Sequence, residues 1–313
     1  EFGLIAVAKE LAKSLPDNGF EGIGDDCAVL DIGSGESLVF TADLVVEGIH
    51  FLSSAEPESV AIKALNVNLS DVASMGVRPI ATLLSIALPH EASQNGWAER
   101  FIESYAAASK EAGVALIGGD TTASKEHIAI NVTAIGRGKS ENLKRRSSAQ
   151  AGDVICVTGR LGGSARGLRE LLCGVSDTDA VKRHLMPRAR IEQGEWLGTK
   201  SGVGAMMDIS DGIASDLRHI LRNSGVSAII DLDKIPIAES ASLDDALSGG
   251  EDYELLLTIR ANDFKGINDD FRSRFGCELY PIGKIAECSS QPDIEYCRGE
   301  KSAEYRLSGF THF

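Results

Sequence analysis

The spacing of hydrophobic and polar positions changes repeatedly along the chain, which predicts a mixture of strands and helices. Residues 27–32 and 37–45 are short apolar segments that flank the turn "GSGE", a pattern typical of a β-hairpin. Pro57 opens a longer segment that stays apolar nearly all round until Gly76, which predicts a buried helix. The run "IATLLSIALP" then predicts a buried strand, and "NGWAERFIESYAAASKEAG" predicts a helix with Asn95 as its cap.

The remainder of the first half continues this mixture. At the start, "EFGLIAVAKELAKSLPDNG" predicts an amphipathic helix that ends before Pro16, and "VALIGG" and "HIAINVTAIGRG" predict two more strands. The segment from Gly138 to Asp153 is polar and has the composition of a mobile linker. We therefore place a domain boundary there and predict two domains, residues 1–147 and 148–313.

The second half repeats strands and helices. "VICVTG" predicts a strand that leads through a glycine-punctuated turn into the helix "GSARGLRELL", and another helix follows Pro187. The strand "AMMDIS", the helix "GIASDLRHILRNSG", the strands "SAIIDL" and "DYELLLTI", and a final helix with short strands complete the chain. The predicted fold class is α+β, with an N-terminal α/β sheet domain and a C-terminal α+β domain.

Composition and charge exclude several classes of protein. With 313 residues, of which 43% are hydrophobic, the chain can bury a large core, and its formal net charge of -15 argues against nucleic-acid binding. The longest apolar run is far too short to cross a bilayer, and the N-terminal segment lacks the pattern of a signal peptide. Six scattered cysteines without a C-x-x-C pair favour reduced thiols. We expect a cytoplasmic protein with neither nucleic acid nor membrane as a partner.

Aspartates recur where the predicted elements end. In "GIGDDCAVLD", Asp25 and Asp26 stand side by side after a glycine, and an ordinary turn would also explain such a pair. The other aspartates at such positions are Asp43, Asp71, Asp120, Asp208 and Asp211. Each one alone is a weak signal, but together they form a pattern.

Asp71 is the aspartate that a purely structural explanation fits least well, because its predicted helix is apolar nearly all round. A buried acid rarely persists without a partner or a metal ion. Asn68 lies one turn before Asp71 on the same face, and Lys63, two turns before it on roughly that face, could instead neutralise the carboxylate.

If several of these acids converge, they must protonate or hold cations. Two like charges ~4 Å apart repel by about 4 kcal/mol at an effective dielectric of 20. Aspartate oxygens select hard ions, and Mg²⁺ fits best because a few carboxylates, waters and substrate phosphates hold it. The chain has no Walker-type phosphate loop; "TGRLGGSARGL" is a weak phosphate signal, and "IGGDTT" predicts a strand that ends in two glycines and delivers Asp120 to an open sheet edge.

Three further polar residues have two explanations each. Arg146, in the polar linker, is either a phosphate clamp or a solvated charge, and composition favours the solvated charge. Glu251 in "SGGEDYELLLT" either belongs to a turn or faces a cationic ligand. A lone histidine such as His50 is more often structural than catalytic.

Six blocks, in order, carry a family resemblance: "GIGDDCAV", "TADLVVEGIHF", "KALNVNLSDVASMG", "LIGGDTT", "MDISDGIASDLRHI" and "SGGEDYELL". Together they resemble the thiamine-monophosphate kinase family, part of an ATP-binding superfamily that includes aminoimidazole ribonucleotide synthetase. The resemblance covers essentially the whole chain. It implies a two-domain subunit that forms a homodimer through its N-terminal sheet, with ATP and several Mg²⁺ ions in the cleft. The implied reaction transfers the γ-phosphoryl group of ATP to thiamine phosphate, which gives thiamine diphosphate and ADP.

The resemblance also assigns roles to residues. The implied Mg²⁺ ligands are Asp26, Thr41, Asp43, Asp71, Asp120, Asp208 and Asp211. The implied ATP contacts are Gly119, Asp120, Arg146 and Ser210, and the implied thiamine phosphate contacts are His50, Glu251 and Phe310, with Leu307 as the alternative to Phe310. No general base is implied. Two other functions stay open: a different ATP-dependent enzyme of the superfamily, and a non-catalytic dimer that binds magnesium and nucleotide.

Overall fold

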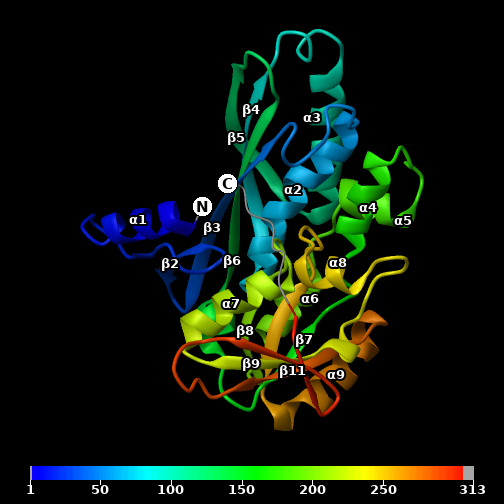
Figure 1. Cartoon of the computed structure of the whole chain (residues 1–313). Coiled ribbons are helices and arrows are strands. Elements are labelled where there is room, and N and C mark those ends of the chain that lie inside the picture. The colour runs from blue at the N-terminus through cyan, green and yellow to red at the C-terminus, as the bar shows by residue number, and fades with distance from the viewer. Residues whose placement is uncertain (1, 306–313) are drawn as a thin grey trace.

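Each half of the chain builds one β-sheet, and helix α2 (Pro57–Ser74) contacts strands of both (Figure 1). The computed structural model describes residues 2–305. Two sheets with helices packed on them confirm the predicted α+β class. Among the helices of residues 2–305, none is both long and apolar enough to cross a membrane.

The N-terminal sheet has six strands in the order β1-β2-β3-β6-β4-β5. Its strands are β1 (Phe20–Glu21), β2 (Ala28–Gly33), β3 (Glu36–Val46), β4 (Arg78–Leu88), β5 (Ala115–Ala123) and β6 (Ala129–Lys139). The pairs are antiparallel except β4 with β5, which is parallel. Helices α2 and α3 (Trp97–Ala112) pack on one face and share its hydrophobic core. The predicted hairpin is confirmed as β2 and β3.

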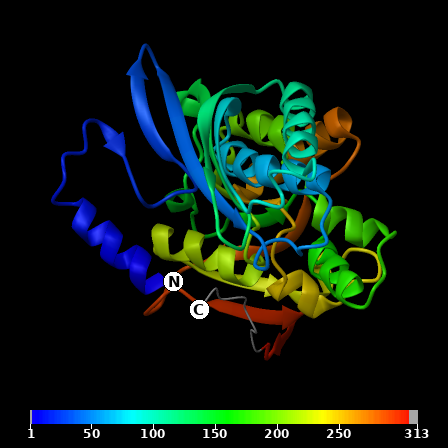
Figure 2. The same ribbon diagram turned by 90° about the horizontal axis from the view of Figure 1, so that it is seen from above.

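The other face of this sheet carries exposed apolar side chains. They are Leu44, Ile80, Leu83 and Ile117, which are between 37% and 57% exposed. Helix α1 (Phe2–Ala12) lies at the margin of the molecule, as two views show (Figures 1 and 2). Its residues Leu4, Val7 and Leu11 are exposed as well. This half of the molecule therefore leaves a continuous apolar sheet face and an apolar helix uncovered within the single chain.

The C-terminal sheet has seven strands in the order β13-β12-β9-β11-β7-β10-β8. Its strands are β7 (Val154–Val157), β8 (Val203–Asp208), β9 (Ser227–Asp231), β10 (Leu255–Ile259), β11 (Tyr280–Ala286), β12 (Ile294–Arg298) and β13 (Lys301–Ala303). One face packs on α7 (Ile213–Ser224) and α8 (Leu243–Ser248), and the other on α6 (Ile191–Gly198) and α9 (Ala261–Phe275). Helices α4 (Gly163–Leu172) and α5 (Asp179–Leu185) pair beside them.

Two sequence-based expectations were wrong. The segment from Gly138 to Asp153 is not a loose linker, because Lys144 is buried and donates hydrogen bonds to the carbonyls of Lys200 and Val203. Two short 3-10 turns, Ser140–Asn142 and Arg146–Ser148, order this segment. The strand β5 also does not end at its glycine pair but continues through it to Ala123. Helix α5 was not predicted, since its seven residues are too few to show a period.

Glycines let α6 approach α2 closely at the junction of the two halves. A Cβ atom on Gly194 would lie 2.2 Å from the carbonyl oxygen of Ala73, and one on Gly198 would lie 2.1 Å from that of Gly76. These distances are too short for any side chain, so the two helices can pack this closely only because α6 has glycine at both positions.

We therefore expect Gly194→Ala to destabilise the protein by about 1–3 kcal/mol, because the new methyl group must push α6 away from α2. Gly266→Ala is the matched control, since Gly266 is also inside a helix but a Cβ there would meet nothing within 4 Å. It should stabilise by about 0.5–1 kcal/mol through the lower chain entropy of alanine. Thermal melts of the two variants test this, and equal shifts of the same sign would contradict it.

Candidate metal and substrate site

Side chains alternate between the two faces of strand β3, and this places two of the predicted metal ligands on the face that packs on α2. Val39 and Val45 point into the core, so Thr41 and Asp43, which lie between them with the same period of two, face α2 as well. The hydroxyl of Thr41 donates to Asp71 Oδ2 at 2.6 Å, and the backbone N–H of Asp43 donates to Asn68 Oδ1 at 2.9 Å. This strand and this helix therefore form one wall of a polar site.

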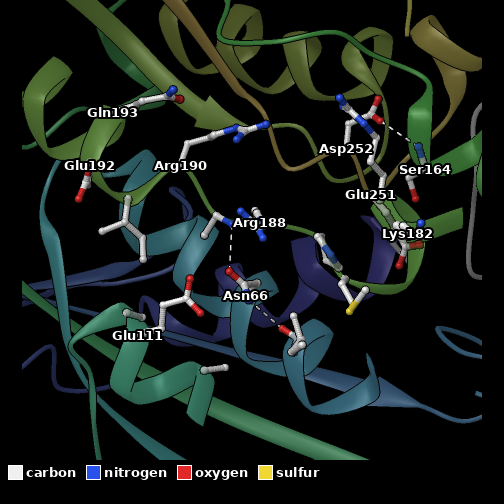
Figure 3. Close-up of a pocket in the computed structure, with 18 of the residues that line it drawn as sticks. Asn66, Glu111, Ser164, Lys182, Arg188, Arg190, Glu192, Gln193, Glu251 and Asp252 are labelled. Carbon is white, nitrogen blue, oxygen red and sulfur yellow. Dashed lines mark hydrogen bonds between the residues drawn. The ribbon is translucent and has the colours of Figure 1, made fainter. Parts of the chain in front are cut away.

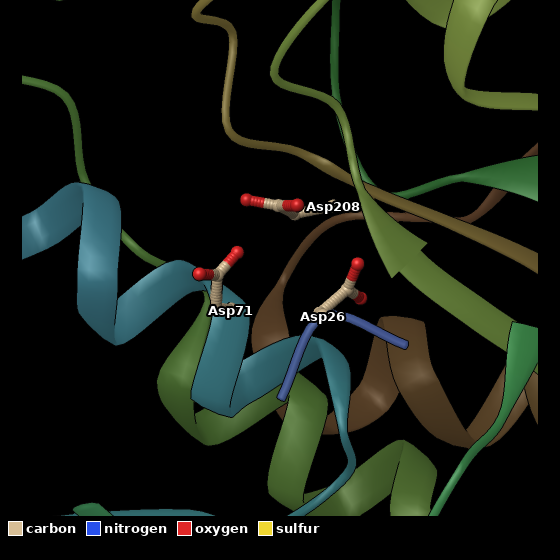
Figure 4. Close-up of side chains that lie close together, drawn as sticks. All are labelled: Asp26, Asp71 and Asp208. Atoms are coloured by element: carbon tan, nitrogen blue, oxygen red, sulfur yellow. The ribbon is translucent and has the colours of Figure 1, made fainter. Parts of the chain in front are cut away.

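Three carboxylates from distant parts of the chain meet at this wall. Asp26 precedes β2, Asp71 lies on α2 and Asp208 ends β8 of the other sheet. One carboxylate oxygen of each lies within 4.8 Å of those of the other two, and the side chains surround one shared space (Figure 4). Asp26 and Asp71 come from the N-terminal half and Asp208 from the C-terminal half, so the site forms only where the two halves pack together.

Serine hydroxyls on α2 support two of these carboxylates. Ser70 donates to Asp208 Oδ2 at 2.5 Å, and Ser74, one turn later, donates to Asp26. Neither serine was predicted. Their spacing of four residues on an otherwise apolar helix is the signal that could have found them.

The adjacent residues Asp25 and Asp26 make different contacts. Asp25 accepts the backbone N–H of Arg146 at 2.7 Å, whereas Asp26 faces the shared space and accepts the Arg146 guanidinium through Nε at 3.0 Å and through a second nitrogen. The side chain of Asp26 is 1% exposed. Their mutual repulsion is thus offset by Arg146, which is half-buried and not the solvated charge that composition favoured.

The clustered acids are held in surroundings that disfavour their charged forms. Burial, with the charges of Asp43 and Asp208, raises the pKa of Asp71 well above its ordinary value. Burial and the charge of Asp26 raise the pKa of Asp208 to about 8 and that of Asp43 to about 6. Burial also raises the pKa of Asp26, although Arg146 opposes this. With all four acids ionised, the group would carry more negative charge than Arg146 neutralises.

A hard divalent cation fits this arrangement. Asp71 and Asp208 are hydrogen-bonded to hydroxyl groups and make no ion pair with any residue among 2–305. All the converging side-chain donors are carboxylate oxygens, the ligand type that Mg²⁺ prefers. Asp211 lies close enough to raise the pKa of Asp43, and its own backbone N–H donates to Asp216, a buried acid that was not predicted.

The structure places the remaining predicted ligand, Asp120, elsewhere. Asp120 pairs in register with Ser85 of β4. Ser85 pairs with Asn131 of β6, and Asn131 pairs with Leu44 of β3, so these residues form one row across the exposed face of the sheet. It is itself exposed and lies on β5, the edge strand. Its neighbour Gly119 sits so close to Leu84 that a Cβ would overlap the backbone there. Within the single chain, Gly119 and Asp120 are not part of the group of converging acids.

Glu251 and His50 come together through Lys63, which settles the alternative raised for Asp71. The Lys63 ammonium donates to Glu251 Oε2 at 3.0 Å and to the His50 carbonyl at 2.8 Å, so it does not neutralise Asp71. Burial opposes the ionised form of Glu251, but Lys63 and His184 lower the pKa of Glu251 to about 2. The carboxylate of Glu251 is therefore ionised. The other predicted contacts of thiamine phosphate, Phe310 and its alternative Leu307, lie outside the described residues.

The segment that carries Glu251 is tied to the segment that follows β8. The N–H groups of Glu251 and Tyr253 donate to the carbonyls of Ser210 and Ile209, at 2.8 and 2.9 Å. Ser210, a predicted ATP contact, thus lies between the acid Asp208 and the loop of Glu251. The acid Asp208 and the predicted substrate contact Glu251 are therefore held in one backbone framework.

Asp252 closes the glycine-rich turn that was the weak phosphate signal. Its carboxylate accepts the N–H groups of Gly162 at 2.6 Å and Ser164 at 3.2 Å, at the N-terminus of α4. Burial raises the pKa of Asp252 to about 7. Because an internal acid already occupies these donors, the turn is not an open phosphate site.

A cleft of about 1070 Å³ lies behind Glu251 and Asp252, between α2 and α3 on one side and the segment 179–193 on the other (Figure 3). Ile62 and Asn66 of α2 line it, on the face of that helix opposite to Asp71. Asn66 Oδ1 accepts the N–H of Ala189 at 3.1 Å across the cleft. The cleft and the group of acids are therefore on opposite sides of α2.

Comparison with known proteins supports the sequence resemblance. Residues 24–138 match the family model of the AIR synthase related protein N-terminal domain, and residues 150–291 match that of the C-terminal domain. The chain is 38% identical to thiamine-monophosphate kinase of Haemophilus influenzae, over 93% of this chain and 91% of the relative. It is 35% identical to thiamine-monophosphate kinase of Buchnera aphidicola, over 100% of this chain and 98% of the relative.

The fold agrees with a solved relative over the whole chain. The structure of AaThiL complexed with AMPPCP and TMP superposes with a TM-score of 0.83 at 31% sequence identity, and covers 100% of this chain and 97% of that one. With full-length identity above 30% to several curated relatives, the chain belongs to the thiamine-monophosphate kinase family.

Proposed function

We propose that this chain is a thiamine-monophosphate kinase, which transfers the γ-phosphoryl group of ATP directly to thiamine phosphate with the aid of Mg²⁺. Family membership over the full length supports the reaction, and AaThiL, a structural relative, is complexed with AMPPCP and TMP. The observation that carries the proposal is the convergence of Asp26, Asp71 and Asp208 between the two halves. A group of acids without enough internal cations suits a reaction between two phosphate-bearing anions that repel each other.

The proposed magnesium ligands are the converging acids together with Thr41, Asp43 and Asp211. When bound there, Mg²⁺ would neutralise and align the phosphate oxygens of the two reactants. The chain's own part is to hold these carboxylates in place through the hydroxyls of Thr41, Ser70 and Ser74. We further propose that Arg146 and Ser210 contact ATP, and that His50 and Glu251 contact thiamine phosphate, with Phe310 as a further contact.

The reaction does not require a general base from the protein. The acceptor is a phosphate monoester with a second pKa near ~6, so its oxygen is already largely ionised at neutral pH. That oxygen forms the new bond to the γ-phosphorus while the bond to the β–γ bridging oxygen breaks, and ADP leaves. The residues around the site accordingly position and neutralise charge, and none needs to act as a nucleophile.

We propose that the protein acts as a homodimer that pairs through the open face of the N-terminal sheet. The apolar side chains on that face, including Leu83 and Ile117, lack a cover within the described chain. A second copy would cover them and the exposed row that contains Asp120, so Gly119 and Asp120 would reach ATP at the dimer interface.

The six free thiols are consistent with the cytoplasmic location that the sequence predicts.

ADP release from ATP and Mg²⁺, measured with and without thiamine phosphate, tests the proposed reaction. Release that depends strictly on thiamine phosphate, with thiamine diphosphate as the second product, is the expected result. Magnesium-dependent ATP binding without any turnover would identify a non-catalytic nucleotide-binding dimer instead. Turnover with another acceptor from a substrate panel would identify a different enzyme of the superfamily.

We expect Asp71→Asn to lower kcat by roughly 100-fold or more, because it removes a carboxylate from the place where the transferred charge must be neutralised. The variant should still fold, and without Mg²⁺ its melting temperature should equal or exceed that of the wild type, since one repelling acid is gone. Asp31→Asn, a surface acid that accepts the Gly33 N–H, is the control. Near-normal kcat in Asp71→Asn, or loss of activity in both variants, would contradict the assignment.

We expect Ile117→Lys to convert the dimer to a monomer, because it places a charge within the proposed apolar interface. Light scattering coupled to size exclusion should then report a mass near 33.2 kDa instead of twice that value. Leu172→Lys is the control, since Leu172 is 67% exposed on α4, away from the sheet. A wild-type monomer, or equal behaviour of the two variants, would refute pairing through this face.

A further inference from the structure

We infer that Lys63 is a positioning residue for thiamine phosphate, which fixes the two proposed substrate contacts, His50 and Glu251, relative to each other. This inference rests on the proposed function. Lys63 belongs neither to the acids nor to the proposed ligand contacts, yet its ammonium group lies between the two elements that carry them. It would therefore act through these residues and not by contact with the reacting atoms.

The contacts of Lys63 join segments that are far apart in the sequence. Its ammonium donates to the His50 carbonyl at 2.8 Å and to the Glu251 carboxylate at 3.0 Å, which lies 188 residues further along the chain. The side chain of Lys63 is 3% exposed, so both hydrogen bonds form in a site shielded from water. A buried ammonium with two fixed acceptors holds them at a defined separation, which a flexible surface pair would not do.

A second group meets Glu251 from the C-terminal half. His184 Nδ1 lies 3.2 Å from Glu251 Oε2 and 3.0 Å from Ser164 Oγ, and both His184 and Ser164 are buried. The carboxylate is therefore held from α2 on one side and from α4 and α5 on the other. These contacts from both halves of the chain keep the Glu251 carboxylate in place relative to each half.

The surroundings of Glu251 show why it needs such contacts. Its backbone has a φ of 64°, in the left-handed region that non-glycine residues rarely adopt, and its side chain is 25% exposed. It also lines the cleft of about 1070 Å³ behind α2, which leaves room for the side chain to swing away (Figure 3). Among the contacts of the described residues, Lys63 is the partner on α2 that keeps the carboxylate from turning into the cleft.

Steady-state kinetics on Lys63→Met separate positioning from a purely structural role. We expect the KM for thiamine phosphate to rise at least about 10-fold, while the KM for ATP stays within about twofold, since loss of a buried charge partner displaces Glu251 but not the acids. Lys63→Arg, which retains the charge, should show an intermediate KM. The rise caused by Lys63→Met should be smaller in a Glu251→Gln background, because the two residues act together.

Asn66→Ala is the matched control. Asn66 lies on the same helix and makes its own contact across the cleft, to the Ala189 N–H, but has no link to His50 or Glu251. It should lower the melting temperature without changing either KM. If Lys63→Met lowers only the melting temperature, or if both variants raise the KM for thiamine phosphate equally, Lys63 is structural and the inference fails.

Two further comparisons keep the test decisive. If Lys63→Met does not fold, the double variant Lys63→Met/Glu251→Gln takes its place, because it buries no unpaired carboxylate. Its KM for thiamine phosphate is compared with that of Glu251→Gln. A higher KM, caused by the lost contact with His50, supports the inference, and an equal KM overturns it. The wild type is assayed first. If it shows no ADP release that depends on thiamine phosphate, the proposed function itself is wrong, whereas an active wild type with an unchanged KM in the Lys63 variants refutes only the inference.

Discussion

The site depends on the close approach of the two halves of the chain along α2, which brings acids of both together. Asp71 and Asp208 belong to different halves, and their oxygens meet where α6 packs directly on the end of α2 and β8 lies beside that helix. Gly194 and Gly198 make that approach possible, since no side chain fits between these helices. Close packing at Ala73, two residues after Asp71 on α2, thus contributes to how near the acids of the two halves come.

This arrangement opposes stability in the absence of ions. Carboxylates that burial and mutual repulsion push toward protonation cost folding free energy, and the hydroxyls that hydrogen-bond to Asp71 and Asp208 orient them without neutralising them. A ligand that binds only the assembled site stabilises the assembled state by mass action. Ion binding and the packing of the two halves should therefore be linked, so that the substrate complex is also the most stable form.

The sequence predicted most elements and the main acids, but not the relations between them. The hairpin, the buried helix and the strand that ends at Asp208 were evident from local period and from glycine and proline positions. The order of strands, the packed linker around Lys144 and the side of the sheet on which Asp120 lies depend on contacts between distant residues. One result was accessible from the sequence: Lys63 and Asp71 are eight residues apart, about 12 Å along a helix axis, too far for one side chain to bridge.

The distribution of cations follows from what each part of the site must bind. Glu251 pairs with Lys63 and stays ionised in a fixed position, which suits the contact with thiamine phosphate proposed for it. Among residues 2–305, Asp71 and Asp208 have no such partner, and a lysine there would occupy the place of the proposed metal ion and repel it. Arg146 stands between these cases: it already pairs with Asp26, yet it sits at the margin of the group of acids, where a phosphate could exchange for that carboxylate. In the proposed reaction, polyphosphate binding would thus redistribute contacts that Arg146 already makes.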